Sequence, residues 1–79
     1  MKLLVYSLKG IEFEGEILSF NVKTRSGEIT ILNHHRPLIT LLEKGEAKIG
    51  LENGASKKIE ISSGFLEMDD KNNLSVLVD

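Results

Sequence analysis

Turn signals recur at short intervals along this chain, and they limit the segments between them to strand length. Examples are Lys9-Gly10, Arg25-Ser26-Gly27 and Asn53-Gly54. Ile11–Glu14 alternates apolar and polar residues, as a half-buried strand does, and Gly15 after it marks an expected bulge or bend. Turns spaced by about eight to twelve residues are typical of sandwiches and barrels. We therefore predict an all-β fold, a small flattened β-sandwich or barrel of about eight to ten strands.

Length and composition set the remaining bounds. With 79 residues, 41% of them hydrophobic and 28% charged, the chain has the composition of a globular protein, and we expect one domain spanning residues 1–79. Because cysteine is absent, disulfides and thiolate metal sites are excluded. The net charge of −2 gives no support for a nucleic-acid surface. No apolar run approaches the roughly 18 residues needed to cross a bilayer.

One segment departs from the strand pattern and is the main candidate for a functional loop. Ile29–Leu32 is followed by Asn33-His34-His35-Arg36-Pro37, which holds both histidines, one of the two arginines and the only proline. Pro37 cannot donate to a sheet ladder, and it biases Arg36 towards extended geometry. We therefore expect an ordered surface loop, and loops positioned by a rigid scaffold often carry function.

Two enzymatic readings of the sequence are weak. His34, His35 and Glu43 resemble the His and Glu ligands of cupin-like metal-binding β-barrels. Adjacent histidines in extended backbone point to opposite faces, however, and a third histidine is absent. No serine stands in a Gly-x-Ser-x-Gly elbow, and Asp69-Asp70 reads as a solvated turn. We expect no catalytic residue, no metal and no cofactor, and therefore a protein that is not an enzyme.

A carrier domain is a further alternative. Asp70-Lys71 at a hairpin tip resembles the modified lysine of lipoyl carrier domains, which are also all-β and of similar length. Those domains hold their lysine near mid-chain between two similar halves. Here only eight residues follow Lys71, and no halves repeat. A small sandwich with a polar loop and no catalytic set is more simply a module that presents surfaces to other proteins.

The segment GEITILNHHRPLIT, residues 27–40, resembles the signature of the ATP synthase epsilon subunit in its amino-terminal β-sandwich. Asn33 and His34 stand where that family usually has proline and glycine, and Thr30 and Arg36 also depart from its pattern. Further blocks in the same order are Phe13–Ile17, Ser62–Glu67 and Leu74–Asp79, so the resemblance covers nearly all of the chain. The matching positions of the signature are Gly27, Glu28, Leu32, His35, Pro37, Leu38 and Thr40.

The resemblance implies a fold and a set of partners. Leu38–Glu43, whose leucines also have helical spacing, is expected to be a strand. The chain is expected to be a rotor subunit of the central stalk, linking the gamma subunit to the c-ring and supporting the coupling of proton flow to ATP synthesis. Glu28 and His35 match positions on the c-ring side, and Ser7, His35 and Thr40 match positions on the gamma side.

The resemblance also implies a location and an absence. Such a subunit is peripheral, held by the complex at the cytoplasmic face of the bacterial inner membrane or at the organellar equivalent. Full-length members of the family continue into a two-helix hairpin that can inhibit ATP hydrolysis. These 79 residues hold no such hairpin sequence, so we expect them to couple the two partners without inhibiting the enzyme.

Overall fold

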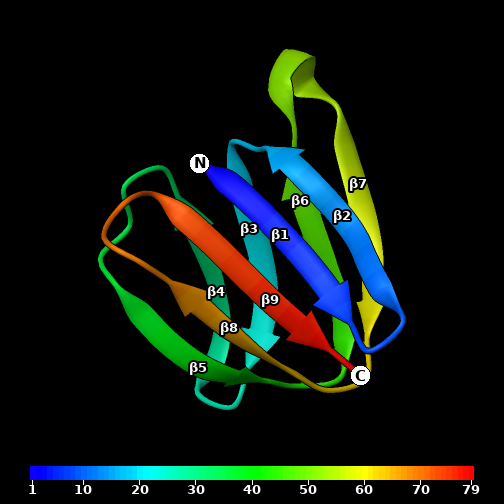
Figure 1. Ribbon diagram of the computed structural model, residues 1–79. Helices are drawn as coiled ribbons and strands as arrows, with labels where there is room; N and C mark the ends of the chain where they lie inside the picture. Colours follow the sequence, from blue (N-terminus) through cyan, green and yellow to red (C-terminus); the bar gives the residue numbers. More distant parts are fainter.

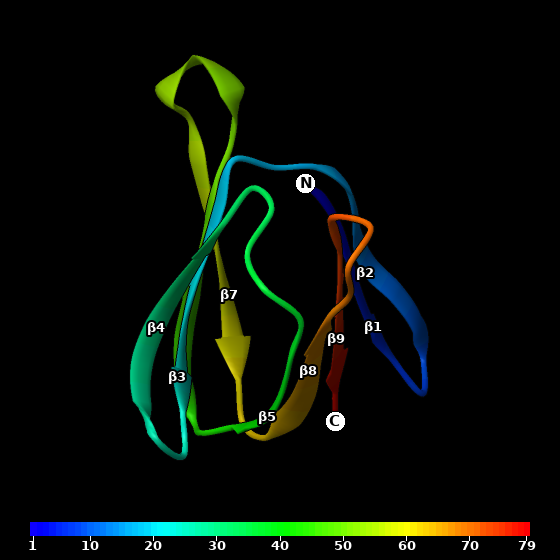
Figure 2. The same cartoon turned by 90° about the vertical axis from the view of Figure 1, so that its left-hand side faces the viewer.

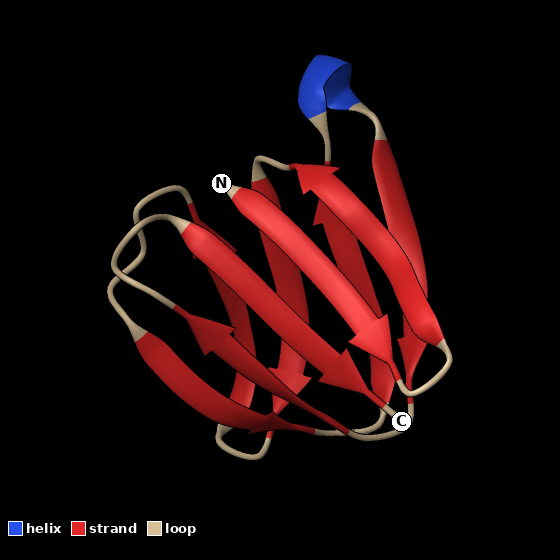
Figure 3. Ribbon diagram, viewed as in Figure 1, coloured by secondary structure: helices blue, strands red, loops and turns tan.

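Nine strands and one short 3-10 turn make up the computed structural model, which describes all residues, 1–79 (Figure 1, Figure 3). The all-β class and the expected number of strands are confirmed. The strands are β1 (Lys2–Ser7), β2 (Gly10–Glu16), β3 (Ser19–Thr24), β4 (Gly27–Leu32), β5 (Leu38–Leu42), β6 (Gly45–Gly50), β7 (Ser56–Ile61), β8 (Gly64–Met68) and β9 (Asn73–Val78), and the 3-10 turn η1 is Glu52–Gly54.

A single sheet curls over to make two layers. Its strand order is β2-β1-β9-β8-β5-β3-β6-β7, with β4 paired to β3. The front layer holds β2, β1, β9, β8 and β5, and the back layer holds β4, β3, β6 and β7 (Figure 2). β5 reaches the back layer through one pair, Thr24 with Leu42. All strand pairs are antiparallel except β1 with β9, which run parallel in the middle of the front layer.

The core fills the space between the two layers and is almost wholly aliphatic. Alternate residues of the strands point inward, as the period of two requires. Phe20 is the only aromatic residue in the buried cluster, and its side chain is fully buried. Burying one such apolar side chain contributes about 1.5–3 kcal/mol, so these contacts hold the layers together. The other members are Met1, Leu3, Val5, Ile17, Val22, Ile31, Leu42, Ala47, Ile49, Ile61, Leu66, Met68, Leu74, Val76 and Val78.

Two local expectations are resolved by the strand registers. Leu38–Leu42 is a strand and not a helical turn, because it pairs in full with β8, from Leu38 with Met68 to Leu42 with Gly64. The expectation of a bulge at Gly15 is wrong. Gly15 pairs regularly with Leu3, and the register shifts instead opposite Val5 and Tyr6, where Glu12 is the extra residue.

Candidate functional site

The polar loop between β4 and β5 is ordered by its own backbone. His35 N donates to Leu32 O at 3.1 Å and closes a turn, and His34 within that turn has a left-handed φ of 62°. His34 N donates to the side-chain oxygen of Asn72 at 2.7 Å, which ties the loop to the turn between β8 and β9. His35 Nδ1 lies 2.8 Å from Arg36 O.

Asn33 anchors the same loop from its other side. Its Oδ1 accepts hydrogen bonds from the Met1 ammonium at 2.5 Å and from Asn72 Nδ2 at 3.4 Å. The Met1 ammonium also donates to Ile17 O at 3.3 Å and to a Glu16 carboxylate oxygen at 3.4 Å. Three segments far apart in sequence therefore meet at this loop, and they fix where it lies.

The β8–β9 turn that receives the loop is itself held by one carboxylate. Asp69 Oδ1 accepts from Asn73 N at 2.9 Å and from Lys71 N at 2.8 Å. These hydrogen bonds, that from Asn73 foremost, hold the pKa of the Asp69 carboxyl below its ordinary value, because they favour the charged form. In the Asp69-Asp70 pair, Asp69 therefore stabilises the turn through its hydrogen bonds.

Glu28 and His35, which the resemblance places on the c-ring side, lie towards opposite ends of β4. Glu28 is the second residue of that strand and pairs across to Lys23, and its Oε2 accepts from Asn21 Nδ2 at 3.2 Å. A strand rises about 3.3 Å per residue, so Leu32 at the other end is roughly 13 Å away, with His35 in the loop beyond it. The two residues therefore lie well apart, towards opposite ends of β4, which is an outer strand of the back layer.

Ser7 and Thr40 are also separate from the loop. Ser7 ends β1, and its Oγ accepts from Lys9 N at 3.1 Å in the turn that follows. Thr40 pairs with buried Leu66, so its half-buried side chain faces the interior side of the front layer. The structure does not bring Ser7, Thr40 and His35 together into one cluster.

A surface that the sequence reading missed crosses the outside of the front layer. The strand registers align one outward residue from each of its five strands. On β5, β8, β9 and β1 these side chains stand next to buried core residues such as Leu66, Val76 and Val5. Four of the five outward side chains are between 38% and 63% exposed. We call the set the apolar row: Leu41 of β5, Phe65 of β8, Leu77 of β9, Tyr6 of β1 and Ile11 of β2.

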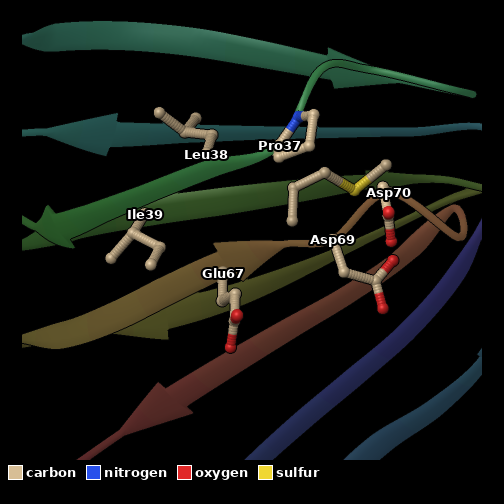
Figure 4. A pocket seen from close by; sticks show the side chains of 7 residues that line it. Pro37, Leu38, Ile39, Glu67, Asp69 and Asp70 are labelled. Atoms are coloured by element: carbon tan, nitrogen blue, oxygen red, sulfur yellow. The ribbon is translucent and has the colours of Figure 1, made fainter.

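A mixed row runs beside the apolar row, two residues away along β5, β8, β9 and β1 and, because of the extra residue Glu12, three residues away along β2. It contains apolar Ile39 and Leu4 together with Glu67, Ser75 and Glu14. Where β5 begins and β8 ends, this row borders an open hollow of about 500 Å³ (Figure 4). The hollow connects the apolar surface with the end of the polar loop, because it is lined by Pro37, Leu38, Ile39, Glu67, Met68, Asp69 and Asp70.

The outside of the back layer has the opposite character. Its outward positions alternate with core residues of β3, β4, β6 and β7, and charged or polar groups occupy nearly all of them. Lys58 and Glu46 form an ion pair there at 3.8 Å. The two outer faces of the sandwich therefore differ in kind. The outward polar residues of the back layer are Asn21, Lys23, Glu28, Thr30, Glu46, Lys48, Lys58 and Glu60.

The chain offers few groups for chemistry. No three His, Asp or Glu side chains come together in a way that could hold a metal ion. Among its elements there is no helix with the length and apolar character that a membrane span requires. The geometry instead defines a class: a small rigid β-sandwich with one apolar face, one polar face and an anchored polar loop between them.

The comparisons with known proteins identify the family. The model of the family described as "ATP synthase, Delta/Epsilon chain, beta-sandwich domain" matches residues 1–79. The chain belongs to this family, and the resemblance noted in its sequence is confirmed.

The chain is similar to curated proteins of about twice its length. It is 37% identical over 68 residues to the ATP synthase epsilon chain of Acinetobacter baylyi, which covers 86% of this chain and 49% of that protein. The same values hold for the epsilon chain of Acinetobacter baumannii. The chain thus spans about half the length of the curated relatives it matches.

Two solved assemblies contain chains of the same fold. One is the mitochondrial ATP synthase of Euglena gracilis, OSCP/F1/c-ring, with a TM-score of 0.90, 21% identity, and coverage of 96% of this chain and 48% of the other. The second is the central stalk and c-ring of the Tetrahymena thermophila mitochondrial ATP synthase, with a TM-score of 0.82, 18% identity, and coverage of 99% and 62%. At these identities the likeness concerns the fold.

Proposed function

We propose that these 79 residues form the sandwich of a central-stalk rotor subunit of a proton-translocating ATP synthase and link its gamma subunit to the c-ring. The family match supports this proposal, and it displaces the cupin-like and lipoyl-carrier alternatives. The relatives at 37% identity are named ATP synthase epsilon chains. One solved neighbour belongs to an assembly described as OSCP/F1/c-ring, and the other to one described as central stalk and c-ring.

The observation that carries the proposal is the difference between the two outer faces. A subunit that transmits torque between two proteins needs two separate docking surfaces on a body that does not deform. The front layer offers an apolar surface, and the back layer with its edge offers charged and polar groups. Between them lies a close-packed core, and protein interiors of this kind have low compressibility and transmit strain.

We give the individual residues the roles that the family resemblance implies. Glu28, exposed at the start of β4, faces the polar loops of the c-ring, where a carboxylate attracts Arg or Lys. His35 lies at the other end of the same strand, near the junction of the c-ring and gamma. Ser7 and Thr40 lie along the gamma side. None of these groups makes or breaks a bond, so the subunit is non-catalytic, requires no cofactor and is held at the membrane surface only through its partners.

Replacing Glu28 with glutamine is expected to weaken c-ring binding modestly. Glutamine keeps an oxygen that can accept from Asn21, so only the charge is removed. An exposed ion pair contributes about 0.2–1 kcal/mol, and the loss should shrink as salt rises. Titration of the chain onto c-ring-containing complexes at low and high salt measures this effect. Glu52→Gln in the β6–β7 turn is the control for net charge, and a large loss indifferent to salt would contradict the role given to Glu28.

Adding the chain to an epsilon-free ATP synthase is expected to restore coupled proton pumping without strong inhibition of ATP hydrolysis. Inhibition by a hairpin requires a second element that extends and makes its own contacts. The only helical element in these residues is the three-residue turn Glu52–Gly54. Stoichiometric binding with restored pumping would support the proposal. Absence of binding would overturn it, and saturable inhibition would show that the sandwich alone can inhibit.

A further inference from the structure

The apolar row has the geometry of an interface and not of scattered surface leucines. Its five members come from five neighbouring strands and are placed side by side by the strand registers. Strands lie about 4.8 Å apart, so the row spans roughly 19 Å across the front layer. An extended apolar patch rimmed by polar groups marks an interaction site more often than chance exposure does.

The backbone of the front layer restricts what can cover this row. β1, β9 and β8 each already have a strand on both sides, so their backbone groups are paired within the sheet. An occupant must therefore dock through side chains onto the face. A helix presents such a stripe of side chains, and roughly 19 Å corresponds to about 13 helical residues, or between three and four turns.

Carboxylates flank the row on one side and define the charge of the occupant. Glu67 lies in the mixed row next to Phe65, and Asp70 lies in the adjoining hollow; neither takes part in any of the four ion pairs of the chain. At the far end, Glu14 is paired only with exposed Lys2, at 3.7 Å. Near the hollow, the positive charge of Lys71 contributes to lowering the pKa of Asp69. Electrostatic complementarity therefore predicts Lys or Arg along the flank of the partner that faces these carboxylates.

We propose that the apolar row is the docking site of a basic amphipathic helix supplied by the gamma-type partner. The helix lies across the strands, its apolar stripe covers Phe65 and Leu77, and Lys or Arg on its flank reaches Glu67 and the hollow. This inference rests on the proposed function and names the chemistry of one of its partners. A second copy of the chain is a poorer occupant, since its own acidic flank would meet the same carboxylates.

The test compares variants on the two outer faces. Phe65→Thr combined with Leu77→Thr removes the centre of the row, and threonine suits exposed strand positions. The matched control is Leu32→Thr, because Leu32 is 56% exposed on β4 in the other layer. Glu67→Lys reverses the flank charge, and Glu60→Lys on β7 controls for net charge. Urea midpoints establish that each variant is folded before it is titrated against an epsilon-free catalytic complex that contains gamma.

The row variant is expected to bind about 10- to 100-fold more weakly, as the loss of central apolar anchors does. Glu67→Lys should lose about two- to fivefold at low salt, and both controls should bind within about twofold of the unaltered chain. Hydrogen exchange of the bound complex should protect a basic helical segment of gamma. Unchanged binding by the row variant, protection of a non-helical segment, or a dimer of the chain that the row variant abolishes would each overturn the inference.

The design separates this inference from the function on which it rests. If the unaltered chain binds neither gamma nor the c-ring, the proposed function is wrong. If it binds and restores coupling while the row variant does so equally well, only the docking site assigned here is wrong.

Discussion

Replacing Phe20 with alanine is expected to lower the free energy of unfolding by about 3–5 kcal/mol. Phe20 has the largest of the fully buried side chains, and it sits on β3, the strand that contacts β4, β5 and β6. Its register partners Ile31 and Ile49 are also fully buried, so the cavity left by the missing ring has no easy way to collapse. A domain of this size has a total stability of roughly 4–12 kcal/mol, so the variant should be partly unfolded at physiological temperature.

Urea unfolding followed by circular dichroism measures this loss. Phe65→Ala is the matched control, because Phe65 is 39% exposed on the outside of β8 and its loss leaves no cavity. The control should change stability by less than about 1 kcal/mol. Equal effects of the two substitutions would show that Phe20 does not occupy the core position given to it here.

Replacing Gly64 with alanine is expected to destabilise the front layer by about 1–3 kcal/mol, as overpacking does. A Cβ built on Gly64 would lie 2.5 Å from Leu77 O, a backbone atom that cannot swing aside as a flexible side chain does. Gly64 begins β8 and pairs with both Leu42 and Val78, so the three strands must separate to make room. Because Phe65 and Leu77 belong to the apolar row, the proposed binding to gamma should weaken as well.

Gly15→Ala provides the comparison for Gly64→Ala. Its Cβ would lie 3.7 Å from the Phe13 ring, an ordinary contact, and nothing would have to move. Urea midpoints of the two variants should therefore differ clearly, with Gly15→Ala near the unaltered chain. If Gly64→Ala is as stable as Gly15→Ala, then β8 and β9 are further apart than described.

The strands could be predicted where local pattern and burial agree. The hairpin of β6 and β7 is one case, since Asn53 and Gly54 adopt the left-handed φ values of 67° and 76° that Asn-Gly favours. β5 is the opposite case. Leu38 and Leu42 point inward while Leu41 points outward, so leucines on both faces of a strand imitate helical spacing. Only pairing with β8, which no local rule supplies, decides between the two.

The candidate site was less predictable, because it depends on contacts between distant segments. The hydrogen bonds that anchor the loop join Asn33 to Met1 and Asn72, and His34 to Asn72. His34 matches a glycine of the signature that the sequence resembles, and its φ of 62° costs a side chain roughly 1–2 kcal/mol. The Asn72 oxygen that accepts from His34 N offsets part of that cost. A sequence shows the unusual residue but not the bond that compensates for it.

The apolar row could not be predicted from the sequence pattern alone. The largely apolar run Lys2–Leu8 predicts a strand that is buried on both faces or lies at the centre of a sheet. In the structure Leu3 and Val5 are buried, while Leu4 and Tyr6 face outward and are only half-buried. The available signal is that apolar residues occupy both the odd and the even positions of the strand. This pattern distinguishes a covered face from a docking face only when the strand register is known.

The parallel pairing of β1 with β9 constrains the order in which the chain can fold during its synthesis. The hairpins of β3 with β4 and of β6 with β7 are local, and such hairpins form within about 1–10 μs of leaving the ribosome. β1 must instead wait for a neighbour near the far end of the sequence. Lys2 pairs with Asn73, 71 residues further on, so at about 5–20 residues per second that wait is roughly 4–14 s. Throughout this interval the edge of β1 that pairs with β9 is open, and such an unpaired apolar strand edge makes the nascent front layer a natural client of a chaperone.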